Sequence, residues 1–181
     1  MGGGATRLAL RVSTRTSSYR VEAFLFCMGV FGILCIMKVY MDVCCLNRPF
    51  DDQNQDRVRI EAEAILNILE YCQNGVWTLA ASKALDFELA QCPDPVKLAG
   101  MRTLYAVAQN RLTVTEQVKI RSRAFRQQGL SFFDSLHVAL AEAYQQDVFL
   151  TTDDRLYRAA TALRPGIRVE NPVIWFMEVT Q

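Results

Sequence analysis

The feature that most constrains the fold is the alternation of short apolar segments with longer amphipathic segments from Met37 onward. The apolar segments, rich in β-branched and aromatic residues, are MKVYM ending at Asp42, VWTLAAS, RLTV, DVFLTT and IRVE. Segments with apolar residues at helical spacing separate them, such as RVRIEAEAILNILEYCQ and SFFDSLHVALAEAYQQ. Strands that alternate with helices predict an α/β fold with a mostly parallel central sheet of about five strands.

The composition is consistent with one globular domain. The chain has 181 residues, of which 51% are apolar and 22% are charged, so it can bury a full core. The formal net charge is +1, which argues against a strongly basic protein that coats nucleic acid. A local basic face could still bind phosphates. Lys119, Arg121, Arg123 and Arg126 form one such stripe, which is either a solvated helix face or a contact for RNA or an acidic partner.

The cysteines argue against a zinc site and for a reducing compartment. The chain has six, at positions 27, 35, 44, 45, 72 and 92, none in a C-x-x-C pair, and a single histidine, His137. Most lie in apolar or helical contexts, where a free cysteine behaves as a small hydrophobic residue. We therefore expect a reduced, cytoplasmic protein.

The N-terminal segment differs from the rest of the chain. Residues 1–36 begin with an arginine- and serine-rich stretch, and an uncharged apolar run follows from Ala23 to Met37. A membrane-spanning helix needs roughly 20 apolar residues, and this run stops at Lys38 before reaching that length. We expect residues 1–36 to be an N-terminal extension upstream of a functional start at Met37, with the domain at 37–181. The alternatives are a genuine anchor or targeting segment, which would tether the protein to a membrane through residues 23–37, and an additional helix.

Four acidic residues fall where an α/β fold brings its working groups together. The carboxyl ends of parallel strands and the helix N-termini meet at one edge of such a sheet. Asp42 and Asp153 each follow a strand, Glu88 lies early in a helix, and Asp134 lies in the first turn of another helix. Like charges in a partly desolvated cleft repel unless a cation neutralises them. Oxygen ligands alone favour a hard divalent ion, Mg²⁺ or Mn²⁺.

Taken together, these motifs resemble those of a known family. YMDVCCLNRPFDD, LDFELA, SFFDSLHVALA and LTTDDRL occur in this order across Met37 to Gln181, and the chain is similar to PIN-domain proteins. That resemblance implies a three-layer α/β/α sandwich and a metal-dependent nuclease. It also implies Asp42, Glu88, Asp134 and Asp153 as the acidic quartet.

The resemblance also suggests a biological context. Many bacterial PIN-domain proteins are the ribonuclease toxins of toxin–antitoxin pairs. We therefore expect an RNA substrate and an antitoxin protein as partner, and a homodimer. The alternative is a catalytically silent PIN fold that acts as an RNA- or protein-binding module.

One departure from the family and two supporting residues bear on the expected activity. Related chains often carry a small hydroxyl residue directly after the first acid, where this chain has Val43, which removes a hydrogen bond to that acid. Asn47 supplies a polar group in the same loop, and Thr151 is placed to orient Asp153.

Several acids and the histidine also have ordinary structural interpretations. Asp134 and Asp153 could serve only as helix caps. Asp86 and Glu88 lie about 200° apart around a helix, so only one can face the cleft, and the family motif favours Glu88. His137, one turn after Asp134, is either a structural residue or within reach of the metal. The remaining nearby acids, Asp51, Asp52 and Asp154, are expected to be solvated or capping.

Overall fold

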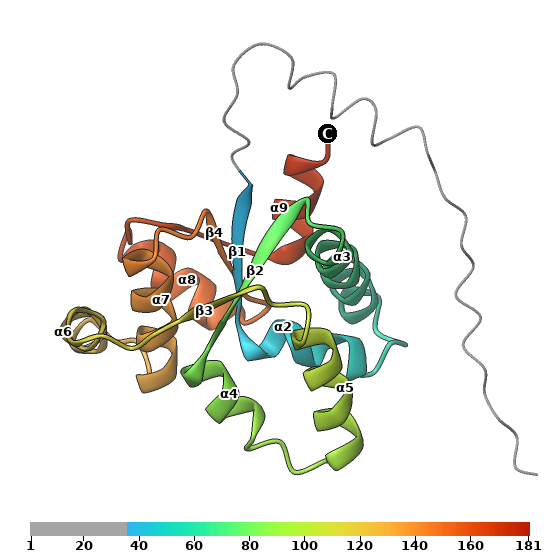
Figure 1. Ribbon diagram of the computed structural model, residues 1–181, viewed down its shortest axis with the longest axis horizontal. Helices are drawn as coiled ribbons and strands as arrows, with labels where there is room; N and C mark the ends of the chain where they lie inside the picture. The colour runs from blue at the N-terminus through green and yellow to red at the C-terminus, as the bar shows by residue number, and fades with distance from the viewer. Residues whose placement is uncertain (1–35) are drawn as a thin grey trace, which may run out of the picture. The chain divides into compact units, whose positions relative to one another are not determined.

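Five parallel strands form the sheet on which the domain is built, in the order β3-β2-β1-β4-β5 (Figure 1). The computed structural model describes residues 36–181. The strands are β1 (Met37–Met41), β2 (Trp77–Ser82), β3 (Asn110–Leu112), β4 (Val148–Leu150) and β5 (Arg168–Glu170). The predicted parallel sheet of five strands is therefore confirmed.

Eight α-helices and one short 3₁₀ helix connect or follow these strands in the described part of the chain. They are α2 (Val43–Asn47), η1 (Arg48–Phe50), α3 (Asp56–Gln73), α4 (Lys83–Leu89), α5 (Pro95–Tyr105), α6 (Glu116–Gln127), α7 (Phe132–Ala143), α8 (Asp154–Ala162) and α9 (Pro172–Val179). The predicted caps Asp94, Thr115 and Ser131 each accept a backbone N–H of the first turn. The helix starts are thus encoded locally in the sequence.

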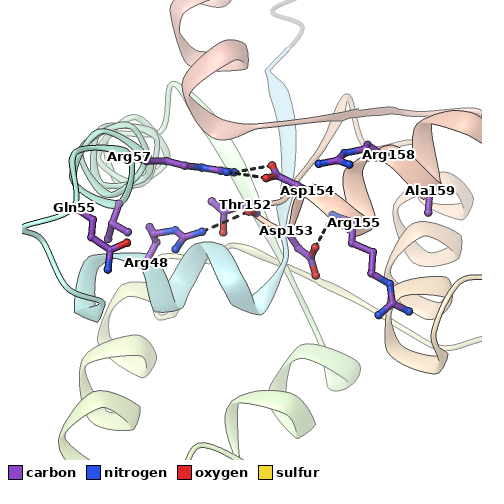
Figure 2. Close-up of a pocket in the computed structure, with 10 residues that line it drawn as sticks. Arg48, Gln55, Arg57, Thr152, Asp153, Asp154, Arg155, Arg158 and Ala159 are labelled. Carbon is purple, nitrogen blue, oxygen red and sulfur yellow. Dashed lines mark hydrogen bonds and ion pairs between the residues drawn. The ribbon is translucent and has the colours of Figure 1, made fainter.

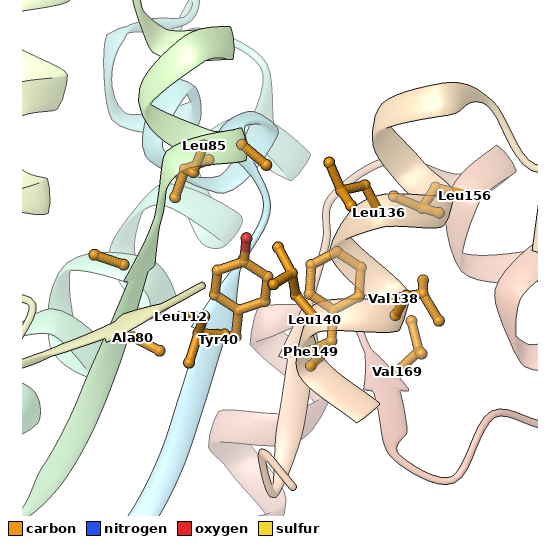
Figure 3. Packing of buried hydrophobic residues seen from close by; sticks show 14 of the residues in the cluster. Tyr40, Ala80, Leu85, Leu112, Leu136, Val138, Leu140, Phe149, Leu156 and Val169 are labelled. Atoms are coloured by element: carbon orange, nitrogen blue, oxygen red, sulfur yellow. The ribbon is translucent and has the colours of Figure 1, made fainter. Parts of the chain in front are cut away.

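The two faces of the sheet bury different side chains, which produces three layers. Tyr40, Ala80, Phe149 and Val169 point to one face (Figure 3), where they share a buried cluster with residues of α4 to α8. Val39, Met41, Leu79 and Leu150 point to the other face, together with residues of α3 and α9. Alternate residues of each strand point to opposite faces, so both faces of these apolar strands are buried. The predicted α/β/α sandwich is confirmed.

A buried ionic cluster lies on α3, where no pattern in the sequence predicted one. The Glu61 side chain is 3% exposed, and its two carboxylate oxygens lie 2.8 Å from Arg48 Nε and 3.0 Å from Arg57 Nε. Asn171 Nδ2 also donates to Glu61 at 3.0 Å. The carboxylate thereby links α3, η1 and the loop before α9.

The predicted N-terminal extension lies outside the described residues, except for Ile36. Within residues 36–181, no helix combines the length and the hydropathy that crossing a membrane requires.

Candidate metal centre

The candidate site lies where the strand order reverses. β1 pairs with β2 on one side and with β4 on the other, so the connections leave β1 and β4 in opposite directions along the sheet. Asp42 directly follows β1, and its backbone N–H donates to Leu150 O of β4 at 2.9 Å. Thr151 directly follows β4. Such a reversal point, at the carboxyl ends of the strands, is where open α/β sheets bind ligands.

The Asp42 carboxylate is buried and held by three donors. Asp42 is 6% exposed. Its Oδ1 accepts the N–H of Val43, the first residue of α2, at 2.7 Å. Oδ2 accepts the hydroxyl of Thr151 at 3.0 Å and the thiol of Cys44 at 2.9 Å. The donor from Val43 is its backbone N–H, because its side chain carries no hydroxyl. Burial raises the pKa of Asp42 well above its ordinary value, and nearby Cys44 and Glu88 raise it further.

Glu88 is positioned by a chain of buried hydrogen bonds. Tyr40 Oη lies 2.7 Å from Ser82 Oγ and 2.6 Å from His137 Nδ1. His137 Nε2 contacts Glu88 Oε2. Because burial raises the pKa of Tyr40, the phenol stays protonated and can donate to Nδ1, which leaves the Nε2 proton to donate to Glu88. His137 then orients the carboxylate.

The Asp42 and Glu88 carboxylates and the His137 ring converge. One ligand atom from each residue lies within 4.8 Å of the other two. Two carboxylates with an imidazole that orients one of them suit a hard divalent cation better than zinc, which favours nitrogen and sulfur ligands. The donor set therefore suits a hard divalent cation.

Asp134 lies in the first turn of α7, where its backbone N–H donates to Ser131 Oγ at 3.2 Å. Its side chain is half-buried, and the carboxylate makes no hydrogen bond or ion pair with another residue of 36–181. Of the predicted reciprocal cap, the bond to the Ser131 side chain is thus present, and the bond from the Asp134 carboxylate back to Ser131 is absent. Because α7 precedes β4 in a parallel sheet, Asp134 lies at the same edge as Asp42, with a carboxylate free to bind a ligand.

Asp153 is the N-cap of α8, which is the ordinary interpretation that the sequence allowed. Its Oδ1 accepts the N–H groups of Arg155 at 2.7 Å and Leu156 at 3.2 Å. Its own N–H donates to Thr151 Oγ1 at 3.1 Å. The Thr151 hydroxyl therefore connects Asp42 to Asp153, while Oδ2 of Asp153 makes no hydrogen bond within the described part of the chain.

The structure brings Asp42 and Glu88 into one group of ligand atoms, and that group does not include Asp134 or Asp153. Both of these lie in the first turn or cap of a helix that runs toward the sheet's amino edge, so they border the same carboxyl edge. Asn47, the predicted supporting residue, starts η1 without a side-chain cap hydrogen bond.

Two other acids are engaged in ion pairs. Asp86 contacts Arg111, whereas Glu88 contacts His137. Asp154 accepts two hydrogen bonds from Arg57, at 2.6 and 2.7 Å (Figure 2). Asp154 is exposed in the first turn of α8, which agrees with the predicted solvated surface position, and Arg57 of α3 reaches across to pair with it.

Sequence reasoning missed three residues that shape the site: Tyr40, Cys44 and Ser82. Ser82 carried a local signal, because it ends a strand and caps the next helix. Tyr40 lies two residues before Asp42 and points to the opposite face of the strand from Met41 and Val39. Its contact with His137 joins residues 97 positions apart, which a local pattern does not reveal.

Comparison with known proteins agrees with this fold. The family model for the PIN domain matches residues 99–162, a segment that includes Asp134 and Asp153. No curated protein sequence matches the chain significantly.

Two solved structures share the architecture. The first is VapBC2 from Rickettsia felis bound to a DNA fragment from their promoter, with a TM-score of 0.50, 15% identity, and coverage of 75% of this chain and 98% of that chain. The second is DNA-bound VapBC from Salmonella typhimurium, with a TM-score of 0.51, 16% identity, and coverage of 76% and 99%. At these identities the likeness shows the fold alone. Together with the family match, it confirms the predicted resemblance to PIN domains.

Proposed function

We propose that this PIN-like protein is a Mg²⁺- or Mn²⁺-dependent nuclease that hydrolyses phosphodiester bonds in RNA. The observation that carries the proposal is the convergence of Asp42 and Glu88 at the carboxyl edge of the sheet, with His137 oriented on Glu88. Capping of α2 uses Oδ1 of Asp42, and it does not account for the approach of the Glu88 carboxylate to the same place. The predicted resemblance to PIN-domain ribonucleases supports RNA as the substrate.

Each residue of the site has a defined task in this proposal. Asp42 and Glu88 would hold the ion, with Asp134 and Asp153 as further ligands, directly or through water. When bound, the divalent ion supplies a Lewis acid that offsets charge on the phosphate oxygens and makes water a stronger nucleophile. Thr151 and the Val43 amide fix the Asp42 carboxylate, and His137 fixes Glu88. Preorganised ligands reduce the reorganisation that the reaction would otherwise require.

The experiment that tests this function is single-turnover cleavage of an end-labelled single-stranded RNA, with Mg²⁺, with Mn²⁺ and with a chelator. The proposal requires cleavage that depends on the metal and stops with the chelator. The second candidate function is a silent PIN fold that only binds RNA or protein, which is favoured by the three donors already occupying both Asp42 oxygens. Binding of the RNA without cleavage at any metal concentration would support that candidate.

We further propose that the chain acts as the toxin of a toxin–antitoxin pair. The two similar structures are described as VapBC proteins bound to DNA, which supports an antitoxin as partner. We also propose a homodimer in solution. Light scattering of the purified chain should give twice the mass of 20.5 kDa, and the monomer mass would contradict this proposal.

Metal should stabilise the folded protein. Mg²⁺ at about 100 times its Kd contributes ~2.7 kcal/mol to the free energy of unfolding. For a domain of this size, that stabilisation raises Tm by roughly 5–10 °C. Differential scanning calorimetry with Mg²⁺ and with a chelator measures the difference.

The metal response should also depend on pH. Burial raises the pKa of Asp42 in the metal-free fold above its ordinary value of 3.8, so ionising this group costs stability as the pH rises through that range. A bound cation needs the ionised carboxylate and offsets this cost, so the Tm shift should grow from acid to neutral pH. A shift that stays the same across this range, or that survives in Asp42→Asn, would contradict the assignment of Asp42.

Glu88→Gln should lower cleavage about 100-fold at low Mn²⁺ and recover part of the rate at high Mn²⁺. The amide keeps the size of the side chain and can still accept from His137, so the main loss is affinity for the cation, which mass action can restore. Asp86→Asn is the matched control, because it neutralises an acid of the same helix that pairs with Arg111. If Asp86→Asn reduced the rate as much as Glu88→Gln, the wrong acid of LDFELA would have been assigned.

A further inference from the structure

A cavity of about 860 Å³ opens beside Asp153, between the first turn of α3, the start of α8 and the segment after α2 (Figure 2). Four arginines line it: Arg48, Arg57, Arg155 and Arg158. The acidic residues of its lining are Asp153 and Asp154. Four guanidinium groups against two carboxylates give the lining an excess of positive charge. A cavity of this size can hold a ligand as large as a nucleotide.

The four arginines are not equally engaged. Arg57 is held by Asp154 and Glu61, and Arg48 lies on the other oxygen of Glu61. Arg155 and Arg158 are exposed, and neither forms an ion pair with a residue of 36–181. Two guanidinium groups therefore remain available to an incoming anion. Arginine matches phosphate oxygens with two parallel hydrogen bonds.

The lining of the cavity also contains a buried polar group. Thr152 lines the same cavity, and its residue is 4% exposed. Its hydroxyl is buried and has no hydrogen-bond partner among the described residues. An unsatisfied buried hydroxyl is uncommon, because desolvation without a hydrogen bond is unfavourable.

We infer that this cavity binds backbone phosphates of single-stranded RNA next to the bond that is cut, with Arg155 and Arg158 as the main contacts. The inference rests on the proposed function for its choice of RNA. Asp153 belongs to the cavity lining and borders the candidate metal centre, so a strand with one phosphate at the acids would bring the adjoining phosphates to the arginines. This continuity favours nucleic acid over an acidic protein segment. Arg57 and Asp154 form the wall of the cavity and hold its shape.

The test is the affinity for a labelled single-stranded RNA, measured by fluorescence anisotropy in a chelator so that no cleavage occurs. The double variant Arg155→Gln/Arg158→Gln should bind about tenfold more weakly, to a similar degree for RNAs of different sequence. The slope of log K against log salt should fall by about 0.7 for each phosphate that the variant no longer neutralises. The double lysine variant should retain most of the affinity, because it keeps both charges.

Arg102→Gln is the control. Arg102 is exposed and lies in the last turn of α5, a helix that precedes β3 and therefore ends at the opposite edge of the sheet. The affinity and salt slope of this variant should match those of the wild type. Urea unfolding of every variant checks that the fold is intact, and the single variants Arg155→Gln and Arg158→Gln replace the double variant if it is destabilised.

Unchanged affinity and salt slope in the glutamine variants would overturn the inference. Competition by poly-glutamate as strong as that of RNA would also overturn it, because the occupant would then be an acidic protein segment. The binding readout is independent of chemistry. The protein could therefore bind RNA through Arg155 and Arg158 and yet cleave no RNA with Mg²⁺ or Mn²⁺. That result would contradict the proposed nuclease activity and support the proposed phosphate-binding site.

Discussion

Asp42→Asn is expected to lower the single-turnover rate of RNA cleavage on the order of 1,000-fold at every Mn²⁺ concentration. The amide preserves the volume of the side chain and can still accept the N–H of Val43, but it removes the buried negative charge that would hold the ion. Because a direct ligand is removed, excess metal should not restore the rate. The measurement is cleavage of an end-labelled single-stranded RNA over a range of Mn²⁺ concentrations.

The choice of control follows from the structure. Asp154→Asn is unsuitable, because Asp154 holds Arg57 through two hydrogen bonds and its neutralisation would disturb the cavity wall. Glu63→Gln is better suited, because Glu63 is 64% exposed on α3 and lies 3.7 Å from its nearest cationic partner, Arg59. If Asp42→Asn cleaved RNA at the wild-type rate, the reaction would not depend on this carboxylate.

Glu61→Ala should reduce the free energy of unfolding by about 3 kcal/mol. The substitution removes the shared partner of Arg48 and Arg57, leaves Arg48 poorly paired at 20% side-chain exposure, and removes the acceptor for Asn171. Urea denaturation followed by circular dichroism measures the change. On the same helix, Glu63→Ala removes an exposed acid and should alter stability by no more than about 0.5 kcal/mol. A decrease below about 1 kcal/mol for Glu61→Ala would mean that the buried ion pairs contribute little net stability.

Much of the fold could be predicted because its signals are local. The spacing of apolar residues along the chain is enough to predict strands that alternate with helices. Asp94, Thr115 and Ser131 marked helix starts that the structure confirms. The short helix α2 was not predicted, because VCC favours a strand by composition. Its start depends on the Asp42 carboxylate accepting the Val43 N–H, which ends the strand and turns the chain.

The candidate site was predictable only in its acids. Asp42 stands out because it ends an apolar segment, Glu88 was chosen over Asp86 from the family motif, and the structure brings the two together. The partners that hold them come from distant parts of the chain: Thr151 lies 109 residues from Asp42, and His137 lies 49 residues from Glu88. Glu61 was also missed because its partners are distant in the sequence. An acid on a helix gives the same sequence pattern whether it faces the core or the solvent. Asp153 shows that a capping role and a proposed ligand role can fall on one residue, because the cap uses Oδ1 and leaves Oδ2 for the proposed ligand role.

The most direct test of the proposed metal-dependent nuclease is a calorimetric Mn²⁺ titration of the wild type and Asp42→Asn, with RNA cleavage measured at the same metal concentrations. We predict that metal occupancy and cleavage rise together in the wild type and are both abolished in Asp42→Asn. Undiminished Mn²⁺ binding by Asp42→Asn, or full cleavage by the wild type in a chelator, would contradict this prediction.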